Sequence, residues 1–478
     1  MPQTSGSLLL GLDGVVVESV HVDVDRTRTI HVLTAVEWVG VCPGCMARSS
    51  RSKGWVTTRP RDIKIGTDIP RIVWRKRKWL CTNTSCTRKS FTESTPSVPP
   101  RARMTVRAKR EMALAVLDDD RSVKAVGAAY GCTWNTCHDA VIATADPALA
   151  AEPEGVTVLG IDETRRGKAK WETCSETGVR RWVDRWDTGL VDITGAGGLL
   201  VQVNGRAAKP VTDWLDKREE AWKANIEFVA IDMSATYAKA AREALPHAKL
   251  IIDRFHLVKR ANEMVDKVRR RTTQAHRLRR GRKSDPEWIN RRRLLRGAER
   301  LTDEQRTKLF EKLTSADPNG DIAAAWITKE LLRDVLACTG RGGLPYEIRD
   351  ALYRFYAFCA ACRVPEIHKF AETIEAWQAP MILAIETGLS NARSEGYNRI
   401  VKHVGRIAFG FRTPENQRRR VRWACTRQSR CQRSRISPGL RGCPSRNSPP
   451  RLSRNSPPLG GVSARCGPRY KVRSASVC

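Results

Sequence analysis

Three short apolar stretches of this chain each end on an aspartate. They cover residues 156–162, 228–232 and 250–253, and they end on Asp162, Asp232 and Asp253. Such runs are typical of buried strands. Strands that end on acids at one sheet edge gather negative charge, and a bound divalent cation relieves the repulsion. The alternative is that each aspartate only caps a following helix. Three together, with a later acid at Glu395, favour a metal site.

The residue types indicate phosphoryl chemistry. Carboxylate oxygens suit Mg²⁺ or Mn²⁺. Two such ions held by three carboxylates can activate a water or a 3′-hydroxyl for an in-line displacement at phosphorus. Glu395 lies in a stretch of helical spacing, and a helix can set its acid against strand-end aspartates. Glu163 competes with Asp162, but strand alternation points it to the opposite face, so we leave it out of the set.

The elements around these acids follow a recognisable order. Strands over residues 183–194 and 199–203 follow the first acid, and helices over residues 210–222 and 234–245 precede the second and third. Three strands, helix, strand, helix, strand is the connectivity of a ribonuclease-H-like α/β core. We place its first part at residues 155–260, its last part with the final acid at 381–430, and a charged helical insertion at 261–380. The arginine runs of that insertion would track phosphate.

Four cysteines near the N-terminus have metal-ligand spacing. Cys42 and Cys45 enclose Pro-Gly, and Cys81 and Cys86 form a wider second pair. Two such pairs complete the four-thiolate site that Zn²⁺ prefers, whereas unrelated buried thiols or a redox pair are the alternatives. We expect a β-unit and zinc ribbon over residues 8–93, with strands at 63–65 and 69–74. Basic residues beside the second pair would present charge to phosphates: Arg75, Lys76, Arg77 and Lys78.

Residues 104–148 have a helix-turn-helix pattern. A helical pattern begins at Thr105, a second helix covers residues 122–130, Gly131 breaks it, and a third begins at Trp134. The helix after the break would enter a DNA major groove. The candidate DNA-binding residues at its start are Trp134, Asn135, Thr136 and His138.

Four motifs resemble those of DDE transposases. They are Gly160-Ile161-Asp162-Glu163, Asp232-Met233-Ser234 with Tyr237, Asp253-Arg254-Phe255-His256-Leu257, and Ser390-Asn391-Ala392-Arg393-Ser394-Glu395-Gly396-Tyr397-Asn398. With the cysteine ribbon and the helix-turn-helix ahead of them, the chain most resembles the insertion-sequence transposases of the ISL3 family, over residues 8–430.

The resemblance implies roles for these residues. Asp162, Asp232 and Glu395 would be the catalytic metal ligands, with Mg²⁺ or Mn²⁺ as cofactor. Asp253 and His256 would support the site, although His256 can also be read as a packed histidine at a helix start. The implied activity is cutting double-stranded DNA at the element ends and joining the freed 3′ ends to target DNA. The same core could also serve a nuclease without joining, or a catalytically inactive end-binding remnant that represses transposition.

Composition agrees with a nucleic-acid partner. The formal net charge is +34, and charge of that size suits DNA or RNA. No apolar run reaches 18 residues, and the N-terminus lacks the basic region of a signal peptide. We therefore expect a bacterial cytoplasmic, nucleoid-associated homo-oligomer on DNA without a membrane partner. In that compartment the 15 cysteines are read as thiols or metal ligands.

The last residues differ in character from the rest. No acid follows Glu415, and Ser-Arg-Asn-Ser-Pro-Pro occurs twice, at residues 445–450 and 453–458. This composition predicts a disordered basic tail over residues 431–478, either an out-of-frame end or an arm that grips DNA. The predicted fold class is multidomain α+β: zinc ribbon, helical helix-turn-helix domain, ribonuclease-H-like core with a helical insertion, and disordered basic tail.

Overall fold

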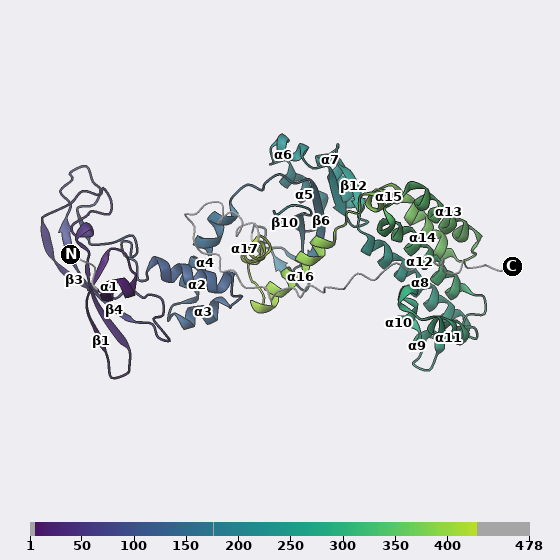
Figure 1. Cartoon of the computed structure of the whole chain (residues 1–478), viewed down its shortest axis with the longest axis horizontal. Helices are drawn as coiled ribbons and strands as arrows, with labels where there is room; N and C mark the ends of the chain where they lie inside the picture. Colours follow the sequence, from purple (N-terminus) through teal and green to yellow (C-terminus); the bar gives the residue numbers. More distant parts are fainter. Residues whose placement is uncertain (1–4, 175, 428–478) are drawn as a thin grey trace, which may run out of the picture. The chain divides into compact units, whose positions relative to one another are not determined.

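The computed structural model describes residues 5–174 and 176–427 (Figure 1). The tail predicted over residues 431–478 lies outside these ranges. Within the two ranges, no helix is both long and apolar enough to cross a membrane.

The N-terminal part is built on a five-stranded sheet. Its elements are α1 (Ser5–Leu10), β1 (Val15–Val22), β2 (Arg28–Thr34), η1 (Val36–Trp38), β3 (Ser52–Thr58), β4 (Arg71–Leu80) and β5 (Ser90–Thr92). The strand order is β1-β2-β4-β3, and β5 also pairs with β4. The strand predicted at residues 63–65 is wrong. Ile65 makes only an isolated bridge to Asp68, and β3 pairs with β4 in the sheet.

Three helices follow: α2 (Val106–Leu117), α3 (Val123–Ala129) and α4 (Trp134–Leu149). Each begins after a hydroxyl side chain that accepts a hydrogen bond from a backbone N–H of the first turn; these caps are Thr105, Ser122 and Thr133. A cap of this kind contributes about 1 kcal/mol. Gly131, with φ of 60°, turns the chain between α3 and α4, a conformation that glycine adopts at little cost.

A second five-stranded sheet forms the centre of the chain. It consists of β6 (Val158–Arg165), β9 (Trp186–Asp192), β10 (Leu199–Asn204), β11 (Phe228–Ile231) and β12 (Lys249–Ile252), in the order β10-β9-β6-β11-β12. β9 is antiparallel to both β10 and β6, whereas β11 is parallel to both β6 and β12. The hairpin of β7 (Lys170–Thr173) and β8 (Arg180–Val183), absent from the sequence prediction, forms its own small sheet.

Helices cover both faces of this central sheet. On one face lie α5 (Ala208–Leu215) and α7 (Ala235–Ala244), which pack on Leu159 and Ile161 of β6. The helix predicted over residues 210–222 is two helices, α5 and α6 (Glu220–Ala224). On the other face lie α15 (Gln378–Thr387), α16 (Ala392–Ile407) and α17 (Pro414–Cys425), which pack around Val158 and Val191. Successive residues of β6 therefore face different helix layers.

The insertion is helical, as predicted. Its elements are α8 (Arg254–Arg277), α9 (Pro286–Ile289), α10 (Arg291–Leu294), η2 (Ala298–Arg300), α11 (Asp303–Leu313), α12 (Asp321–Ala337), η3 (Cys338–Arg341), α13 (Pro345–Ala361) and α14 (Pro365–Ala376). Leu257 and Val265 of α8 pack into a core with Leu332, Phe355 and Ile374. Because α8 starts one residue after Asp253, the insertion begins directly at the sheet edge that carries the acids.

The last described helix, α17, takes part in two cores. Val421 packs beside Val191 of the central sheet. Trp423 is buried among the residues of α2 and α4, and its Nε1–H donates to Asp118 at 2.9 Å. Arg420, 7% exposed, donates to the Val116 carbonyl at 3.2 Å. The helix therefore joins the α2–α4 helices to the sheet that carries Asp162.

Candidate active site and metal centres

Three aspartates lie together at one edge of the central sheet. Asp162 is in β6, Asp232 follows β11, and Asp253 follows β12. These strands are parallel neighbours, and their register, continued past the last paired residues, sets the three aspartates at the same level. The fold therefore gathers the three aspartates that the sequence singled out. The prediction that the first strand ends on Asp162 is wrong, because pairing with β9 extends β6 to Arg165.

Glu395 and His256 reach the same edge from helices. Glu395 is in the first turn of α16, and His256 is in the first turn of α8. Ligand atoms of Asp253, His256 and Glu395 all lie within 4.8 Å of one another, and His256 Nδ1 is 3.4 Å from Asp253 Oδ2. Among the residues with described positions, Asp162 and Asp232 belong to no such group of three. The pair predicted to support the site thus lies directly against Glu395.

Burial shapes the electrostatics of the site. Asp162 is 8% exposed, and its burial raises its pKa to about 6. Burial also raises the pKa of Asp232. The Asp253 carboxylate raises the pKa of His256, and the charges of Asp232 and Asp162 add to that effect.

Two buried carboxylate oxygens of the site accept no hydrogen bond from the described residues. Asp232 Oδ1 is buried and has no hydrogen-bond partner in the described part of the chain, and Asp253 Oδ2, also buried, has only the ion-pair contact with His256 Nδ1. Burying such an oxygen is costly unless something compensates it, and a divalent cation binds oxygens of this type. The residues present therefore fit a divalent metal ion.

Asparagines hold α16 against β6. Asn391 Nδ2 donates to the Ile161 carbonyl at 3.3 Å, and Asn398 Nδ2 donates to Asp162 Oδ2 at 2.7 Å. The Thr164 hydroxyl donates to Asn398 Oδ1. The helix that carries Glu395 therefore also fixes the Asp162 carboxylate. The sequence prediction missed Asn398, although it lies three residues after Glu395 and so on the same helix face.

Gly160 lets α16 approach the sheet. A Cβ at this position would lie 2.6 Å from Asn391 Oδ1 and 2.7 Å from Ser394 Oγ. We expect Gly160→Ala to displace the start of α16, to lower the free energy of unfolding by about 1–3 kcal/mol and to reduce any metal-dependent DNA cleavage by more than about tenfold. Thermal unfolding and a cleavage assay would measure both effects.

The control for this substitution is Gly189→Ala in the neighbouring strand β9. There the nearest atom to an added Cβ would be Leu199 Cδ1 at 3.3 Å, the end of a flexible side chain. Equal stability and activity of the two variants would show that the close approach at Gly160 is not needed.

Glu163 lies on the other face of the sheet, as strand alternation predicts. Its Oε2 accepts a hydrogen bond from the Tyr237 hydroxyl of α7 at 3.1 Å. That hydroxyl also lies 2.9 Å from Thr188 Oγ1. Asp162 is instead bonded to Asn398 of α16. The two neighbouring acids thus belong to different helix layers.

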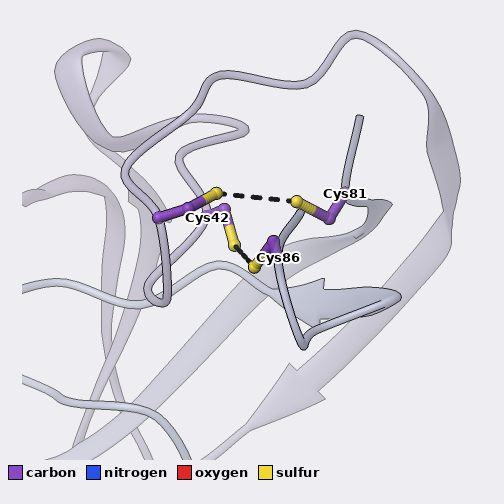
Figure 2. A group of neighbouring side chains, drawn as sticks. Cys42, Cys81 and Cys86 are labelled. Carbon is purple, nitrogen blue, oxygen red and sulfur yellow. Dashed lines mark hydrogen bonds between the residues drawn. The ribbon is translucent and has the colours of Figure 1, made fainter. Parts of the chain in front are cut away.

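The four predicted thiol ligands converge on one centre. The sulfurs of Cys42 and Cys86 are 4.0 Å apart, and those of Cys45 and Cys81 are 3.7 Å apart (Figure 2). All four lie within 4.8 Å of one another. A tetrahedral ion with Zn–S bonds of about 2.3 Å separates its sulfurs by roughly 3.8 Å. The spacing therefore fits a structural zinc ion.

The basic residues predicted to face DNA alternate along β4. Arg75 and Lys78 are exposed and Arg77 is half-buried. The guanidinium groups of Arg75 and Arg77 lie 4.5 and 4.6 Å from the ring centroid of exposed Trp55. Lys76 is buried with Nζ 4.2 Å from the Trp74 ring, and burial lowers its pKa. The prediction for Lys76 is wrong, because strand alternation turns it toward the interior.

The predicted DNA-binding residues of the helix-turn-helix lie at the start of α4. Trp134 and Asn135 are exposed, whereas Thr136 and His138 are half-buried. The rings of Trp134 and His138 stack with centroids 4.5 Å apart, and burial lowers the pKa of His138. Cys137 between them is buried in the helical core. The first turn of α4 therefore offers an aromatic and polar surface beside its core-facing side.

Three family models match successive parts of the chain. A zinc finger of the transposases IS204/IS1001/IS1096/IS1165 matches residues 38–86, and a helix-turn-helix domain of transposase family ISL3 matches residues 93–143. A transposase model of the ISL3 group matches residues 159–421, more than half of the chain.

Individual relatives are also transposases. The transposase for insertion sequence element IS1001 of Bordetella parapertussis is 25% identical over 415 residues, which cover 85% of this chain and 94% of the relative. The transposase for insertion sequence element IS1557 of Mycobacterium tuberculosis is 30% identical over 215 residues, or 40% of this chain. The match spans 46% of that relative, about half of its length.

Proposed function

The chain belongs to the ISL3 family of transposases, and on that premise we propose that it binds the ends of its insertion sequence, cuts the DNA there and joins the freed 3′ ends to target DNA. Two observations support the proposal: Asp162, Asp232 and Asp253 lie at the same level of one sheet edge, and ligand atoms of Asp253, His256 and Glu395 lie within 4.8 Å of one another. The strand order β10-β9-β6-β11-β12, with only its last three strands parallel, supports a ribonuclease-H-like core that α8–α14 interrupt.

In this proposal Asp162, Asp232 and Glu395 hold Mg²⁺ or Mn²⁺, and Asp253 and His256 support them. The bound ion would supply Lewis-acid stabilisation at phosphorus. The protein supplies the positions: Asn398 orients the Asp162 carboxylate, and the Asn391 bond to β6 fixes the start of the helix that carries Glu395. The charges of Lys259 and Arg260 partly oppose the burial that raises the pKa of Asp232, and they would also attract a phosphate to the site.

The N-terminal parts would recognise the DNA. We propose that the ribbon, over residues 8–93, and the helices α2–α4, within residues 104–148, bind double-stranded element ends. The exposed Arg75 and Lys78 would contact phosphates, and the start of α4 would read bases. An element has two ends, and cutting and joining both in one reaction needs an active site at each. We therefore propose that the protein works as a homo-oligomer on DNA.

The test is incubation of the full chain with labelled duplexes that carry the element ends, with and without Mg²⁺. Metal-dependent cleavage products and joined products are the expected result. Binding to the ends without either product would point instead to an inactive end-binding repressor. Cleavage without joined products would indicate a nuclease. Failure to bind the ends would contradict both readings that involve transposition.

A further inference from the structure

A groove runs along α8 away from the acids. It has a volume of about 1170 Å³, and its walls come from α8, α9 and α10. One end is formed by Phe255, whose ring packs edge-on against that of His256 with centroids 5.5 Å apart. Trp288 and Arg292 also line the groove. The groove therefore lies next to the proposed metal site, with Phe255 between them.

The groove is basic. Some of its arginines form ion pairs within the protein: Arg269 and Arg270 pair with Asp266, and Arg271 pairs with Glu366 and Asp321. Three other cations of the lining, Lys259, Arg280 and Arg292, are exposed, and within the described ranges they form no ion pair. Exposed cations without acidic partners suit the phosphates of a nucleic-acid strand.

The groove also offers surfaces for bases. The Trp288 ring is half-buried, and the Arg291 guanidinium lies 4.5 Å from its centroid. Phe255 is 56% exposed. Asn262 Oδ1 is buried in the groove wall and has no hydrogen-bond partner among the described residues. Aromatic rings bind bases by stacking, and an unpaired amide oxygen can accept a hydrogen bond from a base edge.

We propose that this groove binds an unpaired stretch of the DNA strand next to the scissile phosphate. The occupant is single-stranded because the base pairs of a duplex cover each other's faces, so that a wall ring can stack only on a base that has left the helix. Phe255 connects the two sites, since it lines the groove and its ring packs against that of His256. The proposal rests on the proposed function, which brings DNA ends to these acids.

The test compares two DNA probes with the full chain in a buffer without divalent metal. One probe is an end duplex with an unpaired thymidine overhang at the cut position, and the other is the same duplex fully paired. Fluorescence anisotropy gives both affinities. We expect Trp288→Leu and Arg292→Glu each to weaken binding of the overhang probe about tenfold, and to change binding of the paired probe less than about twofold.

The matched control is Arg293→Glu, which places the same charge change on the neighbouring exposed residue of α10, outside the groove lining. It should leave the preference for the overhang probe intact. Equal losses in the Arg292 and Arg293 variants, or unchanged overhang binding in Trp288→Leu with an unchanged melting temperature, would overturn the proposal. The readout needs no cleavage, so a wild-type chain that never cuts would refute the proposed function and leave this result standing.

Discussion

Asp232→Asn is expected to abolish metal-dependent cleavage of element-end DNA, with a loss of at least about 10³-fold, or roughly 4 kcal/mol of transition-state stabilisation. The amide keeps the shape of the side chain but cannot supply the negative charge that a divalent ion needs. Unfolding should not cause the loss. Because burial raises the pKa of Asp232, the folded state penalises the ionised carboxylate at neutral pH, and a neutral amide removes that penalty.

The measurements are initial cleavage rates, end binding by anisotropy, and the melting temperature in metal-free buffer. Binding and melting temperature should stay at or above the wild-type values. Glu163→Gln is the comparison variant, since it removes a nearby charge that acts on Asp232 without removing a proposed metal ligand, and a glutamine can still accept the bond from Tyr237. It should keep cleavage within about tenfold of wild type. A cleaving Asp232→Asn variant would remove Asp232 from the proposed metal ligands.

Cys42→Ser is expected to abolish binding of the zinc ion and to disorder the ribbon. Structural zinc contributes on the order of 10 kcal/mol to small zinc-stabilised folds, far more than the few buried apolar residues around Cys42 can replace. Those residues include Trp79 and Phe91. Zinc content measured by mass spectrometry should fall from about one ion per chain to none. Element-end binding should weaken at least about tenfold if the ribbon contacts phosphates.

Cys174→Ser is the matched control for this prediction. Cys174 is a free, partly exposed thiol that lies far along the chain from the ribbon, next to the β7 strand. Its loss should leave the zinc content and the end binding unchanged. A Cys42→Ser protein that keeps a full zinc ion would show that the four thiols do not form the site.

Much of the chain's local structure could be predicted from the sequence. Caps such as Ser122 and Thr133 and the break at Gly131 act over a single turn, so the three helices of the helix-turn-helix region were predictable. The two cysteine pairs, Cys42 with Cys45 and Cys81 with Cys86, likewise indicated zinc from their short spacing alone. The β3 strand and the β7–β8 hairpin were missed because they are exposed on most of their residues and lack a buried, alternating face.

The sequence by itself determined the kind of protein this is. Residue types and short spacings predicted the zinc ligands and the helix-turn-helix, and the resemblance of four motifs to those of DDE transposases predicted the acids Asp162, Asp232 and Glu395. Only the tertiary structure decided how those parts meet. Asn398 binds Asp162 across 236 residues of sequence, and Lys76 is buried while Arg75 beside it is exposed. The reason is physical: caps and spacings depend on neighbours within a turn, whereas the approach of α16 to Gly160 depends on packing between segments that are distant in the chain.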